Sequence, residues 1–141
     1  MDGPWPLPRQ TGDGEVSEWL ERTLLQGPYL ALATSPRQFK ELVRGMDLEL
    51  PEVWLRPQWN ACTHSWEKES EILCIVCIDL KRSLEVEPTH AAALLAHEAV
   101  HVWQRARDRI GGDIGDEMEA YAVQNICQSL FDAYVKELER K

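Results

Sequence analysis

Residues 72–79 read Ile-Leu-Cys-Ile-Val-Cys-Ile-Asp, and this apolar run decides the fold class. Successive side chains of a strand point to opposite faces, so a run that is apolar at every position predicts a strand covered on both faces. The stretch Trp59–Trp66 has the composition of a second strand, and the charged residues 67–71 predict a turn between the two. We therefore expect an antiparallel hairpin whose second strand is central in a sheet.

Helical patterns flank this hairpin on both sides. Before it, helices are expected over residues 15–26 and from Ser35-Pro36 to about Arg44, because Ser is a favoured N-cap and Pro a favoured first residue. After it, long helices are expected from Pro88 to about Ile110 and from Asp116 to about Leu138, with a glycine-rich link between them. Helices, a hairpin and two long helices in this order predict an α+β fold.

The 141 residues suffice for one domain with its own core. Residues 1–14 are rich in proline and glycine, which predicts a flexible leader before a single domain over residues 15–141. Residues 29–33 form a short apolar piece. Residues 52–56 lie between two prolines and are compatible with either a strand or a turn of helix.

The charge balance restricts the classes of partner. The chain has 15 Lys and Arg against 24 Asp and Glu, a net charge of −9. Such a chain is repelled by phosphate backbones and anionic lipid, so we expect neither a nucleic-acid nor a membrane partner. The apolar run over 72–78 is too short to span a bilayer, and the first residues lack the features of a secretory signal. The composition leaves the oligomeric state open.

The four cysteines are Cys62, Cys74, Cys77 and Cys127. Without a secretory signal, we expect reduced and mostly buried thiols in a cytoplasm. Cys74 and Cys77 are three positions apart in the expected strand, so their sulfurs point to opposite faces. This spacing disfavours a shared metal or redox role for the pair.

The helix expected over residues 88–110 contains His97-Glu98-Ala99-Val100-His101, which is an H-E-x-x-H pattern. Two histidines four residues apart lie one turn apart on one helical face, so both imidazoles can reach a single ion. Glu98 can hold a water on that metal and accept its proton. The pattern also arises by chance, but here it lies in an apolar helix, where three polar groups near a buried face favour a functional reading.

A catalytic zinc takes three protein ligands and leaves one position open. Glu117 and Glu119, at the start of the last helix, are the candidates for the third ligand, because the glycine-rich link lets this helix fold back on the first. Helical geometry puts these two carboxylates about 200° apart, so only one of them is expected to reach the metal. The other is explained by its position near the positive end of the helix dipole.

H-E-x-x-H followed by a carboxylate on the next helix resembles the gluzincins, which are zinc metallopeptidases with a glutamate as third ligand. The stretches Asn60–His64, His97–Gln104 and Glu117–Gln124 are similar to those of small phage- and prophage-encoded metallopeptidases. The resemblance implies a compact zincin-like domain in a bacterial cytoplasm. It also implies Zn²⁺ held by His97, His101 and Glu117, with Glu119 as the alternative ligand.

Two further residues are candidates for the site. In related gluzincins, the residue four positions after the ligand glutamate is Asp or a small residue, whereas here it is Tyr121. Tyr121 is a candidate donor to the oxyanion of a tetrahedral intermediate, or alternatively a residue that packs between helices. His64 is a candidate for binding substrate, or alternatively a strand histidine with no role in function.

The sequence is compatible with two functions. The first is a zinc metallopeptidase that hydrolyses peptide bonds through a metal-bound water activated by Glu98, with the hairpin pairing to an extended substrate. The second is a catalytically weak or inactive zinc-binding protein that uses the same scaffold to bind a partner. Two histidines and one carboxylate also suit iron.

Overall fold

The computed structural model describes residues 18–20, 28–110 and 114–140. The leader expected over residues 1–14 lies outside the described residues. The elements follow the order β1 (Trp19–Leu20), β2 (Tyr29–Ala33), α1 (Pro36–Gly45), β3 (Ala61–Lys68), β4 (Glu71–Ile78), α2 (Leu80–Ser83), α3 (Pro88–Ile110) and α4 (Asp116–Glu139). This mixed arrangement confirms the α+β class.

The four strands form one sheet in the order β1-β2-β4-β3. β3 and β4 make the expected antiparallel hairpin, in which Glu69 and Ser70 take positive φ at the turn. β4 lies between β3 and β2 and is buried from Ile72 onward, as the apolar run predicts. β2 pairs with β4 in parallel, and β1 pairs with β2 antiparallel. β3 is therefore an edge strand.

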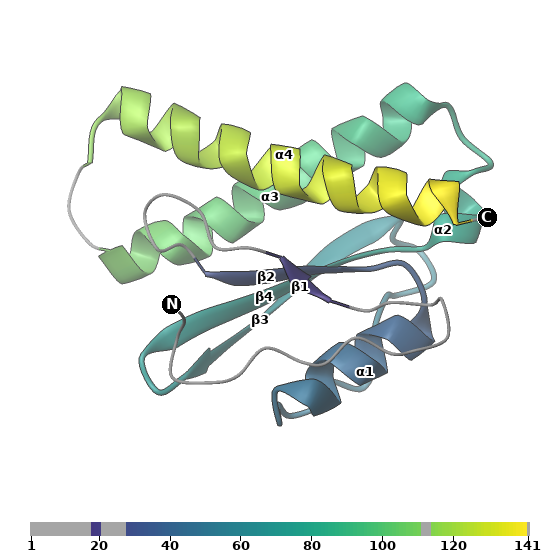
Figure 1. The fold of residues 1–141 in the computed structure, drawn as a ribbon, viewed down its shortest axis with the longest axis horizontal. Helices are drawn as coiled ribbons and strands as arrows, with labels where there is room; N and C mark the ends of the chain where they lie inside the picture. Colours follow the sequence, from purple (N-terminus) through teal and green to yellow (C-terminus); the bar gives the residue numbers. More distant parts are fainter. Residues whose placement is uncertain (1–17, 21–27, 111–113, 141) are drawn as a thin grey trace.

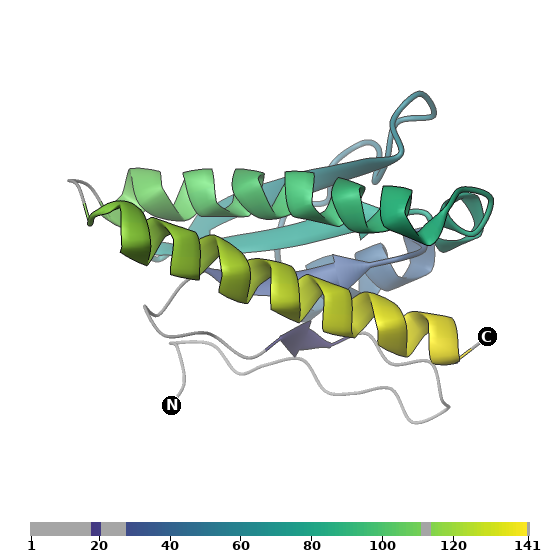
Figure 2. The same ribbon diagram turned by 90° about the horizontal axis from the view of Figure 1, so that it is seen from above.

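Helices cover both faces of this sheet. α3 and α4 lie on one face and α1 lies on the other (Figure 1), and α3 and α4 run side by side in opposite directions (Figure 2). Cys74 faces the α3–α4 side, where it packs in a core with Leu95 and Leu130. Cys77 faces the α1 side, where it packs in a second core with Phe39. The alternation along β4 thus separates these two thiols, as the sequence predicts.

The helix ends follow local rules. α1 begins after Ser35, whose side-chain oxygen accepts a hydrogen bond from the backbone N–H of Gln38 at 3.2 Å. α3 spans the predicted range and ends at Ile110. The short helix α2 is not predicted, because four residues carry no helical period. Asp79 caps it by accepting a hydrogen bond from the backbone N–H of Arg82.

The helix predicted over residues 15–26 is wrong at Trp19–Leu20, which form strand β1 instead. Apart from Glu18, the other residues of the predicted helix lie outside the described residues. β1 pairs with the edge of β2 and buries Trp19, so tertiary pairing outweighs the local helical pattern here. Residues 52–56 form neither of the two expected elements, but a series of bends.

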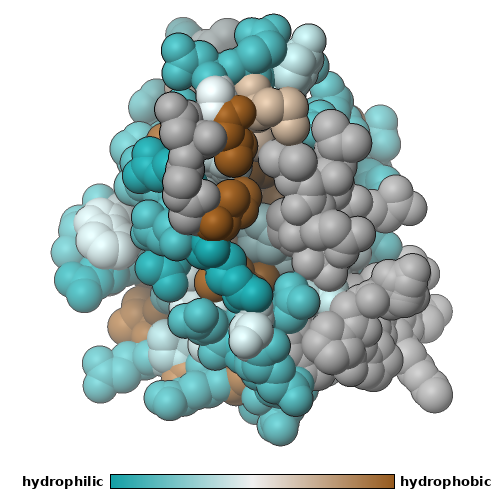
Figure 3. Space-filling view, turned by 90° about the vertical axis from the view of Figure 1, so that its left-hand side faces the viewer, coloured by the Kyte–Doolittle hydropathy of each residue, from teal (hydrophilic) through white to brown (hydrophobic). Residues whose placement is uncertain are grey.

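The surface agrees with the charged composition. Viewed from the end of the molecule where α3 ends and α4 begins, the described surface is largely hydrophilic, with small hydrophobic areas (Figure 3). Within the described part of the chain, no helix combines the length and the hydropathy that crossing a membrane requires.

Candidate metal site

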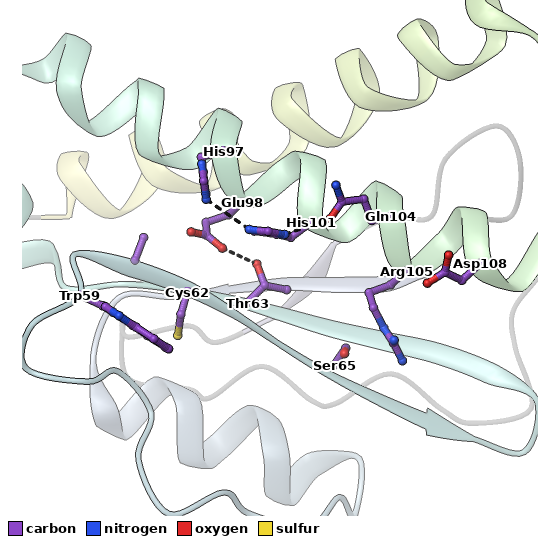
Figure 4. Close-up of a pocket in the computed structure, with 11 residues that line it drawn as sticks. Trp59, Cys62, Thr63, Ser65, His97, Glu98, His101, Gln104, Arg105 and Asp108 are labelled. Atoms are coloured by element: carbon purple, nitrogen blue, oxygen red, sulfur yellow. Dashed lines mark hydrogen bonds between the residues drawn. The ribbon is translucent and has the colours of Figure 1, made fainter.

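A pocket of about 550 Å³ opens between α3 and the edge strand β3. Its walls hold the three polar residues of the H-E-x-x-H pattern and residues of the strand, mostly those that face α3 (Figure 4). The lining residues are Trp59, Ala61, Cys62, Thr63, Ser65, His97, Glu98, His101, Gln104, Arg105 and Asp108. The pattern therefore faces a cavity beside a sheet edge.

His97 and His101 present their Nε2 atoms to each other at 3.2 Å. Two zinc–nitrogen bonds of about 2.0–2.1 Å at a tetrahedral angle would place two such nitrogens about 3.3 Å apart. The two rings lie edge to face, with centroids 4.8 Å apart. Both side chains are exposed at the pocket mouth, so an ion from solvent can reach both nitrogens. The pair therefore fits two adjacent positions on one cation.

Gln104 determines which nitrogen of His101 is available. Nδ1 of His101 donates a hydrogen bond to Oε1 of Gln104 at 3.1 Å. With the proton on Nδ1, Nε2 of the neutral ring carries the lone pair, and Nε2 is the atom that faces His97. Histidines that bind metals commonly have such a partner on their other nitrogen.

Glu98 differs from the histidines because it is buried, with 5% of its surface exposed. The hydroxyl of Thr63, on β3, donates a hydrogen bond to Oε1 of Glu98 at 2.8 Å. Glutamate is rarely buried to this extent without a partner or a function. The carboxylate points from α3 toward the strand, with the imidazole of His97 above it and that of His101 beside it (Figure 4).

The carboxylates of α4 are placed differently from one another. Oε2 of Glu119 accepts a hydrogen bond from the indole Nε1 of Trp103 at 2.8 Å, so Glu119 joins α4 to α3. Glu117 is exposed in the first turn of α4. Neither residue lines the pocket. Among the described residues, no acidic side chain joins the two histidines in a group of three ligand atoms within 4.8 Å of one another.

Tyr121 and His64 also lie outside the pocket lining. Tyr121 is 49% exposed on α4. His64 belongs to the opposite face of β3, where its ring packs against Phe39 at 4.8 Å between centroids. The structure thus brings together His97, Glu98 and His101, and it leaves Glu117, Tyr121 and His64 apart from them.

Trp59 stands at the pocket wall with 45% of its surface exposed. The guanidinium of Arg56 lies 4.8 Å from the centroid of its ring, and Arg82 donates hydrogen bonds to the carbonyl oxygens of Pro57 and Trp59. These contacts hold an aromatic surface at the pocket wall, where it can contact a bound molecule.

A second group of ligand atoms lies on the other face of the hairpin. The side-chain ligand atoms of Cys62, His64 and Cys77 all lie within 4.8 Å of one another. Cys62 and His64 are two positions apart on β3, and Cys77 is the cross-strand partner of Cys62. A two-residue turn at Glu69-Ser70 dictates this register, whereas the sequence analysis places the turn only within residues 67–71. Had the turn been assigned to Glu69-Ser70 from the sequence, the hairpin register would have placed Cys77 opposite Cys62 and predicted this group of ligand atoms.

The thiols of this group have shifted pKa values. A hydrogen bond with Cys77 lowers the pKa of Cys62 to about 6, against the opposing effect of burial, and His64 adds to the lowering. Burial raises the pKa of Cys77 well above its ordinary value. Burial also opposes protonation of His64, but its hydrogen bonds with Cys62 and the Trp54 carbonyl outweigh this, so the pKa of His64 is raised.

Comparison of this chain with protein-family models, with curated proteins and with solved structures gives no match. The functional argument therefore rests on the residues and their geometry.

Proposed function

We propose that this protein is a metal-dependent peptidase whose site is the pocket between α3 and β3. The observation that carries the proposal is the buried carboxylate of Glu98 beside two imidazoles whose Nε2 atoms are 3.2 Å apart. A helix that only needs to pack has no reason to keep an acidic side chain at 5% exposure. A hydrolase does have a reason to keep a buried carboxylate, because its mechanism requires a base next to the electrophile.

His97 and His101 would hold the metal, and Zn²⁺ suits this pair of imidazoles. We keep Glu117 as the proposed third ligand, with Glu119 as the alternative. The Trp103 hydrogen bond already occupies one oxygen of Glu119, and this favours Glu117. A divalent ion in this position supplies Lewis acidity toward a substrate carbonyl.

Glu98 acts as the general base and then as the general acid. Its carboxylate accepts a proton from the attacking water and returns it to the leaving amine. Thr63 holds Oε1 by its hydroxyl and thereby fixes the carboxylate within the pocket. Because the carboxylate is shielded from bulk solvent, its electrostatic effect on a reacting group is stronger than at the surface.

The position of β3 favours an extended peptide as substrate. β3 is an edge strand, and its residues Ala61, Thr63 and Ser65 line the pocket. An edge strand can bind a peptide through backbone hydrogen bonds, which would lay the peptide along the same wall as Glu98.

The second candidate is a protein that binds zinc and a partner without hydrolysis. Two observations favour it: both histidines are exposed, and no acidic side chain among the described residues groups with them as the third ligand that a peptidase site requires. In this case Glu98 would have no catalytic role.

The deciding experiment pairs zinc content with peptide hydrolysis in the wild type and the Glu98→Gln variant. Gln keeps the shape and an oxygen for Thr63, but it cannot accept the proton from water. For a peptidase, we expect normal zinc content and a rate lower by about 10²–10⁴-fold.

The double variant His97→Ala/His101→Ala is the matched control, and it should lose both zinc at this site and activity. Zinc-dependent hydrolysis at the full rate in Glu98→Gln would refute the assigned mechanism. Partner capture by both proteins without hydrolysis would support the second candidate.

A further inference from the structure

We propose that Cys62, His64 and Cys77 form a second metal-binding site, which holds Zn²⁺ on the α1-facing side of the β3–β4 hairpin. Its ligands are different from His97 and His101, although Cys62 also contributes to the wall of their pocket, and the proposal does not depend on the peptidase proposal. It uses three ligand atoms that already lie within 4.8 Å of one another.

The spacing of these atoms fits a tetrahedral ion. Sγ of Cys62 lies 3.5 Å from Nε2 of His64. Zinc–sulfur and zinc–nitrogen bonds of about 2.3 Å and 2.05 Å at a tetrahedral angle would place the two atoms about 3.6 Å apart. The hairpin register sets Cys77 directly opposite Cys62, so the third ligand comes from the neighbouring strand.

A fourth donor is within reach. The carbonyl oxygen of Trp54 accepts hydrogen bonds from Nε2 of His64 at 2.7 Å and from Sγ of Cys62 at 3.3 Å, and an ion that displaces these protons would have this oxygen beside it. The oxygen therefore sits beside the same point between the strands. Two sulfurs and one imidazole select zinc or monovalent copper over magnesium and calcium, which prefer oxygen ligands.

The surroundings suit a structural ion. Cys77 is fully buried and Cys62 nearly so. The ring of His64 packs against both Phe39 and Trp66, with centroid distances of 4.8 Å and 6.1 Å, and these contacts restrict its rotation. A sheltered set of thiolate and imidazole ligands is typical of zinc sites that stabilise a fold.

Metal binding displaces the protons that these groups now share. A thiol binds a metal as its thiolate, so the protons that leave the thiols on binding pass to solvent.

Cobalt distinguishes the two sites, because a Co²⁺–thiolate bond has a near-ultraviolet charge-transfer absorption that a histidine and carboxylate site lacks. Under reducing conditions, we expect Co²⁺ to produce this absorption in the wild-type protein and Zn²⁺ to abolish it by displacement. The absorption should persist in His97→Ala/His101→Ala. It should also persist in Cys127→Ser, because Cys127 lies on α4 rather than in the hairpin. It should disappear in Cys62→Ser and in Cys77→Ser.

A second measurement uses the wild type alone, so it does not depend on the folding of any variant. Zn²⁺ should protect Cys62, but not Cys127, from alkylation by iodoacetamide, as read by peptide mass spectrometry. Absence of both the absorption and the protection would show that the group is only a hydrogen-bonded cluster, and would overturn the proposal. An absorption retained in both cysteine variants would do the same.

Discussion

The hydroxyl of Thr63 donates a hydrogen bond to Oε1 of Glu98 over 2.8 Å, and it joins residues 35 positions apart in the chain. The bond connects the edge strand β3 to the helix α3 at the centre of the pocket. Strand and helix therefore fix the buried carboxylate together, and a substitution in the strand should alter the position of Glu98 on the helix.

The variant Thr63→Val should lower the free energy of unfolding by about 1–3 kcal/mol, because it removes the donor to a buried carboxylate. Thr63→Ser keeps the hydroxyl and should recover most of this loss. Chemical denaturation of the three proteins measures the difference. If Thr63→Val and Thr63→Ser have the same free energy of unfolding, this hydrogen bond does not stabilise the fold.

Replacement of Gln104 tests the orientation of His101. Gln104→Leu leaves Nδ1 of His101 without its acceptor, so we expect zinc affinity to fall by about 10–100-fold. Gln104→Glu keeps an acceptor and should stay close to the wild type. Calorimetric zinc titration in the Cys62→Ser background restricts the measurement to the histidine site. An unchanged affinity in Gln104→Leu would show that this contact does not tune the ligand.

The two acidic residues of α4 should respond differently to alanine. Glu119→Ala removes the acceptor of the Trp103 indole and should lower the free energy of unfolding by about 1–3 kcal/mol. Glu117→Ala is an exposed change and should affect stability little, but we expect it to weaken zinc binding. Zinc titration and denaturation of both variants separate the effects. A larger loss of affinity in Glu119→Ala would reverse the choice of third ligand.

Stability should fall at high pH because of Cys74. Burial raises the pKa of this thiol from 9.0 to about 12. A group whose pKa is raised on folding stabilises the protein fully below its unfolded pKa, and the stabilisation is lost as the pH rises through the folded value. The window is therefore about pH 9 to 12, and the loss amounts to at most about 4 kcal/mol.

The variant Cys74→Val lacks the titrating thiol and fills the same apolar site. Its free energy of unfolding should decline less steeply over this pH window than that of the wild type. Parallel slopes would mean that Cys74 ionises in the native state without penalty. Lysine and tyrosine titrate in both proteins, so their contribution cancels in the comparison.

Much of the fold follows from local patterns. The uninterrupted apolar run of β4 predicts its central place, Ser35-Pro36 predicts the start of α1, and the spacing of His97 and His101 predicts their proximity. Each of these depends on a period or a cap within one element, which a single sequence displays directly.

The remainder depends on contacts between distant elements. The short strand β1 exists because β2 offers an unpaired edge, and no pattern within Trp19–Leu20 indicates this pairing. The cluster of Cys62 and Cys77 depends on the register of the hairpin, which changes with the length of the turn. The third ligand of the histidine pair depends on how α4 lies against α3, and it stays a prediction.

The parallel pairing of β2 with β4 bears on the order in which the chain folds. Tyr29 is the partner of Leu73, and the whole of α1 and β3 lies between them in the chain. Parallel pairing of strands so far apart in the chain is slow compared with forming local structure, because the loop-closure entropy is lost before the contacts form. His97 and His101 belong to one helix, and Cys62, His64 and Cys77 belong to one hairpin. Each set of ligands is therefore brought together by contacts that are local in the chain, and neither set requires the long-range pairing of β2 with β4 for its own spacing.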